Sequence, residues 1–286
     1  MYAIMGITGQ VGGAVARNLI KSNELVRAVV RDAAKAQPWR EAGCEIAVAD
    51  IQEPAALAEA FRGAEGVFIL VPPNFDPRPD FPEAWEIGAK LKAALESAQP
   101  GRVVYLSTIG AQAARPNLLT QHSIIERLLS DVVSPITFLR PGWFMENCAW
   151  DVAPARESGV IPSFLQPLDR LLPMVATADI GETAAALLRE HWTGHRVVEL
   201  EGPRRISSND IGATFSRLLG RPVRMEIVPR DTWENLFLAQ GMKNPLPRIQ
   251  MLDGFNEGWI DFEFGEDARR QGRVELEKVL EGLLGQ

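Results

Sequence analysis

Three glycines with regular spacing follow the first apolar run of the chain. The run Tyr2–Met5 leads into Gly6-Ile7-Thr8-Gly9-Gln10-Val11-Gly12, and an amphipathic stretch comes next. In a strand–loop–helix unit, such glycines permit a tight turn, close approach of a pyrophosphate, and close packing of the helix on the strand. Free N–H groups at the helix start then face the anion. Glycines that only form a turn are the alternative. The loop predicts a dinucleotide site with contacts from Gly6, Thr8, Gly9, Gln10, Val11 and Gly12.

A basic residue stands at the next position that such a site uses. About twenty residues further on, at the end of the second strand, an NAD site usually places an acid that binds the ribose 2′-hydroxyl. This chain has Arg31 there, followed by Asp32 and Lys35. A guanidinium matches a 2′-phosphate, so we expect NADP(H) to be preferred, with NAD(H) as a possible second cofactor. A surface arginine paired with Asp32 or a neighbouring acid is the alternative.

Two more segments follow apolar runs and would lie at the same edge of a sheet. Asp50 can accept a hydrogen bond from the adenine amino group, or it can cap the helix that follows. The stretch 72–82, rich in proline, can form a pocket wall or lid, or an inert surface loop. These segments add Asp50, Ile51, Val71, Pro72 and Pro73 as cofactor contacts and Phe75 as a substrate contact.

The candidate contacts require parallel strands that end at one edge. Short apolar runs alternate with amphipathic stretches over the first 140 residues, as βαβ units do. Several runs are rich in Val and Ile without alternation, which is typical of strands covered on both faces. We expect an α/β fold with a Rossmann-like, doubly wound parallel sheet. The expected strands are Tyr2–Met5, Leu25–Val30, Glu45–Ala49, Gly66–Val71, Arg102–Ser107 and Ile136–Leu139, and the expected helices span about residues 11–22, 53–62, 82–98 and 121–130.

The regular alternation weakens after Arg140. Too few elements follow for a second full core, so we expect a Rossmann domain over residues 1–145 and a smaller α/β lobe over 146–286. The lobe would cover the ligand face, with the chain crossing back between the two parts. Its expected elements are a helix from Asp179, which has capping-box spacing with Glu182, a strand Val197–Glu201, a helix near 208–219 and a strand Val223–Val228.

The composition excludes several classes of protein. Thirty Lys and Arg against 37 Asp and Glu give a net charge of −7, which argues against direct nucleic-acid binding. Two cysteines exclude a disulfide framework, and the three histidines form no zinc-binding pattern. No run approaches the ~18 apolar residues of a membrane-spanning helix. The N-terminus lacks the basic region of a signal peptide, so we expect a cytoplasmic protein. We expect it to be a monomer or a homodimer.

Several segments beyond the glycine loop match one family pattern: Leu106–Ala111, His122–Leu128, Thr137–Asn147, Ala178–Gly181 and Leu218–Val223. On these segments the chain resembles the NmrA-like proteins, which are atypical short-chain dehydrogenases/reductases. The resemblance runs over nearly the whole chain and is most specific in residues 103–147. It implies a Rossmann domain with a small C-terminal lobe and NADP(H) or NAD(H) in the cleft. It also places Ser107, Thr108, Pro141, Gly142, Trp143 and Phe144 at the cofactor.

The two tyrosines constrain the reaction. The wider superfamily usually reduces carbonyls with a Tyr-x-x-x-Lys pair, yet Ile109 lies four residues after Tyr105 and Gly6 four after Tyr2. An unactivated ketone that accepts hydride becomes an alkoxide and needs a positioned acid. A quinone, an azo compound or a cationic dye accepts hydride into a delocalised product. Acceptors of that kind are therefore expected.

His122 is the candidate catalytic residue. It stands where relatives carry Lys or His, four residues before Glu126. It can donate a proton to the reduced substrate or contact the cofactor ribose. The alternative is a histidine at a helix start, hydrogen-bonded to backbone.

Aromatic residues follow the sixth expected strand, where a substrate would approach the nicotinamide. Trp143 and Phe144, with Asn147 and Trp150 as substrate contacts, can hold a flat acceptor, although packing between the lobes is the alternative. Cys148 is either a redox-sensitive thiol or a small buried residue. We expect an NADPH-dependent oxidoreductase acting on small aromatic or quinone-like molecules. The alternative function is a redox sensor that binds NADP(H) and regulates a partner protein, as some NmrA-like proteins do.

Overall fold

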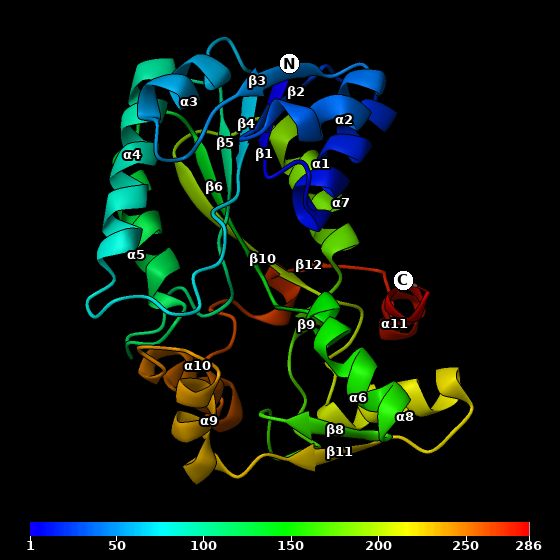
Figure 1. Cartoon of the computed structure of the whole chain (residues 1–286). Coiled ribbons are helices and arrows are strands. Elements are labelled where there is room, and N and C mark those ends of the chain that lie inside the picture. The colour runs from blue at the N-terminus through cyan, green and yellow to red at the C-terminus, as the bar shows by residue number, and fades with distance from the viewer. Residues whose placement is uncertain (286) are drawn as a thin grey trace.

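Eight strands form one parallel sheet in the order β3-β2-β1-β4-β5-β6-β10-β12, in a computed structural model that describes residues 1–285 (Figure 1). The chain order reverses between β1 and β4, which is the doubly wound arrangement expected from the sequence. The strands are β1 (Tyr2–Met5), β2 (Val26–Val30), β3 (Glu45–Val48), β4 (Gly66–Ile69), β5 (Val103–Leu106), β6 (Ile136–Pro141), β10 (His195–Glu201) and β12 (Arg270–Gln271).

Helices cover both faces of this sheet (Figure 1). One face carries α1 (Gln10–Lys21), α2 (Gln37–Glu41) and α7 (Thr177–Arg189), and the other carries α3 (Pro54–Phe61), α4 (Pro82–Ala98) and α5 (Thr120–Leu129). Because both faces are covered, successive residues of β1 enter different cores: Ile4 packs with the first group of helices and Ala3 with the second.

A smaller lobe lies below the carboxyl edge of the sheet (Figure 1). Its core includes Trp233, Phe237 and Phe255, which are buried. The lobe and its connections contain β7 (Trp143–Phe144), α6 (Val152–Glu157), β8 (Val160–Ser163), β9 (Met174–Val175), α8 (Ser208–Leu219), β11 (Arg224–Ile227), α9 (Trp233–Ala239), α10 (Leu246–Glu257) and α11 (Leu276–Leu284). The short 3₁₀ helices of the described residues are η1 (Ala33–Ala36), η2 (Met145–Asp151), η3 (Arg230–Thr232) and η4 (Glu266–Ala268).

The start of α7 differs from the expected capping box. The helix begins at Thr177, and the carboxylate of Glu146 accepts hydrogen bonds from the Thr177 backbone N (2.9 Å) and hydroxyl (2.6 Å). Asp179 instead accepts from the backbone N of Val274 at 3.0 Å. A residue distant in sequence therefore supplies the cap that local spacing assigned to Asp179 and Glu182.

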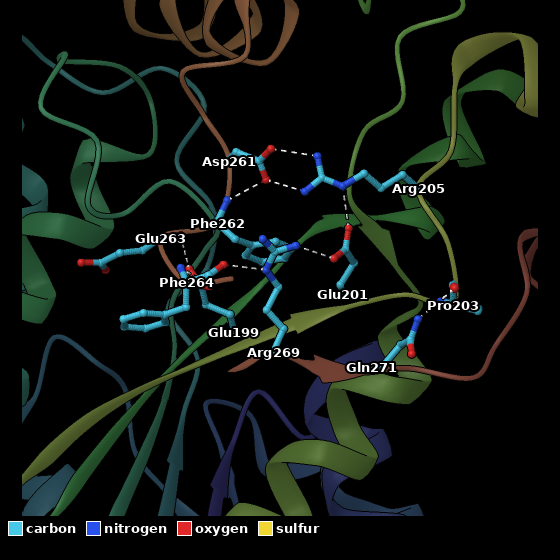
Figure 2. A network of polar contacts seen from close by, with 10 residues as sticks. All are labelled: Glu199, Glu201, Pro203, Arg205, Asp261, Phe262, Glu263, Phe264, Arg269 and Gln271. Carbon is cyan, nitrogen blue, oxygen red and sulfur yellow. Dashed lines mark hydrogen bonds and ion pairs between the residues drawn. The ribbon is translucent and has the colours of Figure 1, made fainter. Parts of the chain in front are cut away.

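An ionic network ties the last strands to the segment 261–264 (Figure 2). Arg205 donates to both carboxylate oxygens of Asp261 at 2.8 Å and to Glu201 at 2.9 Å. The carboxylate of Glu199 accepts from the backbone N of Glu263 and Phe264 at 2.6 and 3.0 Å. The segment is thereby fixed against the carboxyl end of β10.

No helix within residues 1–285 is long and apolar enough to cross a membrane.

Candidate cofactor and active site

The glycine loop joins β1 to α1 at the carboxyl edge of the sheet. Gly6 has a φ of +64°, and a Cβ at Gly12 would lie 2.3 Å from the Gly6 carbonyl oxygen. Helix α1 begins after Gly9, with no side-chain cap and no acidic residue in its first turn. Thr8, Gly9 and Gln10 are exposed. The positive end of α1 is therefore open to an anion.

The carboxyl end of β2 presents uncommitted positive charge. Arg31 is exposed and makes no ion pair within the described part of the chain, while Asp32 accepts from the Ala34 backbone N at 2.9 Å. The expected alternative, an Arg31–Asp32 pair, is thus not formed.

The segment after β3 forms a turn rather than a helix start. Asp50 accepts from the Gln52 backbone N at 2.8 Å, and α3 begins only at Pro54. Ile51 is half-buried against the core beneath α3 and α4. Asp50 therefore holds the local turn, and its second carboxylate oxygen makes no hydrogen bond among residues 1–285.

The loop after β4 spans from the sheet to the smaller lobe (Figure 1). Val71 is half-buried, Pro72 and Pro73 are exposed, and Phe75 is 55% exposed. The Asp76 carboxylate accepts from the backbone N of Lys243 and Asn244 at 2.9 and 2.7 Å, and these hydrogen bonds hold the pKa of Asp76 below its usual value. The loop is consequently a strap between the two parts, not an inert excursion.

A buried ionic cluster lies at the ends of β5 and β6. Glu126 on α5 accepts from the Ser107 hydroxyl at 2.5 Å and from Arg140 Nε and Nη2 at 2.9 and 2.6 Å. Arg140 also donates to Glu263 at 2.8 Å. Ser107 is therefore committed to Glu126, and Thr108 beside it is half-buried. Through Glu263, the cluster joins the ends of β5 and β6 to the network of Figure 2.

His122 lies in the first turn of α5 and pairs with a tyrosine. Its Nδ1 is 2.8 Å from the Tyr105 hydroxyl, so its ring partner is a side chain and not backbone. Desolvation lowers the pKa of His122 to about 4, and the imidazole is neutral near pH 7. Burial raises the pKa of Tyr105 well above its usual value. Tyr105 was expected only as a buried strand residue, because its spacing to His122 carries no motif.

The aromatic segment after β6 divides between core and surface. Trp143 packs edge-to-face on Phe255 with ring centroids 5.1 Å apart, and Phe144 packs beside the core under α1 and α7. Asn147 is exposed and Trp150 is 84% exposed. Pro141 and Gly142 are buried against the start of β9, where a Cβ at Gly142 would lie 2.6 Å from the Pro173 oxygen.

Cys148 is buried and Asp151 half-buried on η2, and their side chains are hydrogen-bonded to each other. Burial raises the pKa of Cys148 well above its usual value, so this cysteine stays a thiol. Burial also raises the pKa of Asp151 to about 7, although its hydrogen bond with Cys148 lowers it in part. Among the described residues, no group of three or more His, Cys, Asp or Glu side chains could hold a metal ion.

Asp151 should make the protein less stable as the pH rises. The pKa of the Asp151 carboxyl is 3.8 in the unfolded chain and about 7 in the folded protein. The folded protein therefore holds a proton that the unfolded chain has already released. The stability that this proton provides is complete at pH values below 3.8 and is lost as the pH rises through about 7. The free energy of unfolding should fall by about 1 kcal/mol per pH unit between about pH 5 and 7 relative to Asp151→Asn. Urea unfolding at several pH values measures this. Asp80 is exposed, so the control Asp80→Asn should show the same dependence of the unfolding free energy on pH as the wild type. If Asp151→Asn also shows the wild-type dependence, the assignment is contradicted.

The glycine loop at the end of β1, in a doubly wound parallel sheet, defines a Rossmann-like protein. The chain belongs to the NmrA-like family, whose model matches residues 2–271. It is 27% identical to the NAD(P)H azoreductase of Xenophilus azovorans over 259 residues, 90% of this chain and 85% of that one. It is 28% identical to quinone oxidoreductase 2 of Escherichia coli K12 over 294 residues, 100% of this chain and 94% of that one. The fold matches the crystal structure of Citrobacter sp. triphenylmethane reductase complexed with NADP(H), with a TM-score of 0.81, 20% identity and 99% coverage of both chains.

Proposed function

We propose that the protein is an NADPH-dependent reductase of quinones and other conjugated acceptors. The observation that carries the proposal is the open N-terminus of α1, held by Gly6 and Gly12, with Arg31 uncommitted at the next strand end. Two relatives, an azoreductase and a quinone oxidoreductase, support this substrate class, because azo compounds and quinones are both conjugated acceptors. A protein of the same fold was solved with NADP(H).

The residues present fit NADP(H). The first turn of α1 offers backbone N–H groups to a pyrophosphate, and Arg31 with Lys35 offers positive charge to a 2′-phosphate. Ile51 and Val71, both half-buried at strand ends, would provide apolar surface for the adenine end of such a molecule. The bound nicotinamide would supply a hydride, and the chain would supply position and field.

The chain's own groups favour easily reduced acceptors. Tyr105 is sealed in the core, and Tyr2 lies at the opposite end of the sheet, at the start of β1. Neither can give a proton to an alkoxide. His122 is neutral near pH 7 and can donate a hydrogen bond from one ring nitrogen. A donor of this strength suits a delocalised anion, and a cationic dye needs no donor at all.

Turnover with a panel of acceptors tests the proposal. The purified protein should oxidise NADPH, followed by its absorbance, in the presence of quinones, azo dyes or triphenylmethane dyes. A simple ketone, which lacks conjugation, should not be reduced. Binding of NADPH without reduction of any acceptor above background would overturn the proposal. That outcome would favour the redox sensor, in which NADP⁺ and NADPH change the conformation or oligomeric state differently.

Arg31→Asp should lower the affinity for NADPH by about 10- to 100-fold. Hydrogen bonds to a charged group contribute about 1.5–3 kcal/mol, and each 1.4 kcal/mol is about tenfold in affinity. NADH affinity should change little, because NADH lacks the 2′-phosphate. Fluorescence titration with both cofactors measures the ratio. Arg127→Asp, an equal change of charge at an exposed site on α5, is the matched control. Equal NADPH affinity in wild type and Arg31→Asp would show that the 2′-phosphate binds elsewhere.

A further inference from the structure

The Tyr105 hydroxyl is a buried polar group with a single described partner. Tyr105 is fully buried on β5, and its ring packs edge-on against Phe138 at 6.3 Å. Within residues 1–285 the hydroxyl contacts only His122 Nδ1, at 2.8 Å. A hydroxyl carries one proton, and a hydroxyl buried like that of Tyr105 donates this proton to an acceptor.

The Tyr105 hydroxyl fixes the position of the imidazole proton of His122. Burial and the nearby charge of Glu126 keep Tyr105 protonated. Its proton has only Nδ1 of His122 to bind, so Nδ1 must be the acceptor. A neutral imidazole has one N–H, and that N–H is therefore on Nε2. The reverse arrangement would leave the Tyr105 proton without an acceptor in the core.

The Nε2 atom remains available to a bound molecule. It makes no hydrogen bond among the described residues. The fully buried side-chain N and O atoms that lack a partner there are Glu83 Oε2 and Trp192 Nε1, so Nε2 of His122 is not fully buried. Its neighbours in α5 contact the loops that leave two strand ends: Gln121 donates to the Asn74 oxygen at 2.9 Å, and Ser123 donates to the Ala111 oxygen. His122 thus stands between the strap and the loop after β5.

We propose that Tyr105 is a positioning residue that holds His122 as the Nε2–H tautomer, a hydrogen-bond donor to the oxygen of a quinone during reduction. The inference rests on the proposed function for its last step. Bound NADPH would supply the hydride by loss of its C4–H bond and would leave as NADP⁺. The hydride pair would form the new O–H bond at one quinone oxygen, while π electrons of the quinone shift to the opposite oxygen, which is hydrogen-bonded to Nε2–H. Solvent supplies the proton that completes the hydroquinone, and the imidazole stays neutral. Tyr105 itself touches no substrate.

NMR of ¹⁵N-histidine-labelled full-length protein tests the tautomer without any acceptor. His122→Gln assigns the signal among the three histidines. In the wild type His122 should show a protonated Nε2 and an unprotonated Nδ1, and in Tyr105→Phe the two tautomers should become mixed. A wild-type Nδ1–H tautomer, or an unchanged tautomer in Tyr105→Phe, would overturn the inference. The wild-type spectrum decides even if the variant does not fold, and it is independent of turnover.

Kinetics separate positioning from a purely structural role. Tyr105→Phe should lower kcat for quinones by about tenfold or more, since the donor is no longer held in one tautomer, with KM nearly unchanged. Reduction of a cationic triphenylmethane dye should be unaffected, because hydride adds to carbon and no oxygen gains charge. Phe138→Leu, which disturbs the same packing without touching the hydroxyl, should lower both rates alike. An equal loss for quinone and dye in Tyr105→Phe would overturn the role.

Discussion

Gly12→Ala should abolish detectable NADP(H) binding. The added methyl group would lie 2.3 Å from the Gly6 carbonyl oxygen and 2.8 Å from the Met5 oxygen. Both are backbone atoms of the strand and loop, so α1 must move away from β1 and its first turn leaves the phosphate position. Strain of about 1–3 kcal/mol together with a displaced loop predicts a loss of about 100-fold or more in affinity. Isothermal titration with NADPH measures it.

Gly282→Ala is the matched control for this change. Gly282 lies in α11, and an added Cβ would meet no atom outside the adjoining backbone of its own helix, so alanine should be neutral or slightly stabilising there. The far-ultraviolet circular dichroism of both variants shows whether the helices are kept. A folded Gly12→Ala protein with wild-type affinity would mean that the cofactor does not use this loop.

Arg140→Met should lower the free energy of unfolding by about 3–5 kcal/mol. The side chains of Arg140 and Glu126 are only 7% and 9% exposed, so removal of the guanidinium leaves a carboxylate uncompensated in the core. Glu263 loses its partner as well, which loosens the segment that the network of Figure 2 holds. Urea unfolding measures the loss, with the same dependence of the unfolding free energy on urea concentration (the m-value) in wild type and variant.

A double-mutant cycle identifies the cause of that loss. Glu126→Gln with Arg140→Met removes both charges, so the double variant should be more stable than the sum of the single losses predicts. Arg115→Met is the surface control, because Arg115 and Glu257 are 67% and 61% exposed and their pair contributes less than about 1 kcal/mol. Additive losses in the cycle would contradict a coupled buried pair.

The sheet could be predicted because its information is local. The run Tyr2–Met5 matches β1 at both ends, and the expected helix 82–98 matches α4. Strand β4 ends at Ile69, two residues before the expected Val71, and prolines at 72 and 73 cannot donate to a ladder. The roles of Gly6 and Gly12 were also readable, since tight turns and close helix–strand contacts demand glycine at fixed spacing.

The rest of the site depends on contacts between distant segments. Glu146 caps α7 from 31 residues away, and Glu263 reaches Arg140 across 123 residues. Tyr105 meets His122 only because β5 and the first turn of α5 lie side by side. No local pattern encodes such pairs. The helices α10 and α11 were missed. Helix α10 carries no clear apolar stripe, whereas α11 does have apolar residues at helical spacing (Leu276, Val279, Leu280 and Leu283), which were the available signal.

Transfer of deuterium from NADPH labelled at C4 to a triphenylmethane dye tests the central claim most directly. Hydride adds to the central carbon of the dye, so the label stays in the colourless product and mass spectrometry detects it. With the (4R) and (4S) labelled cofactors in separate single-turnover reactions, we expect one deuterium in the product from one of the two and none from the other. A bound cofactor with no reduced dye, or reduced dye that carries no deuterium from either, would contradict the account.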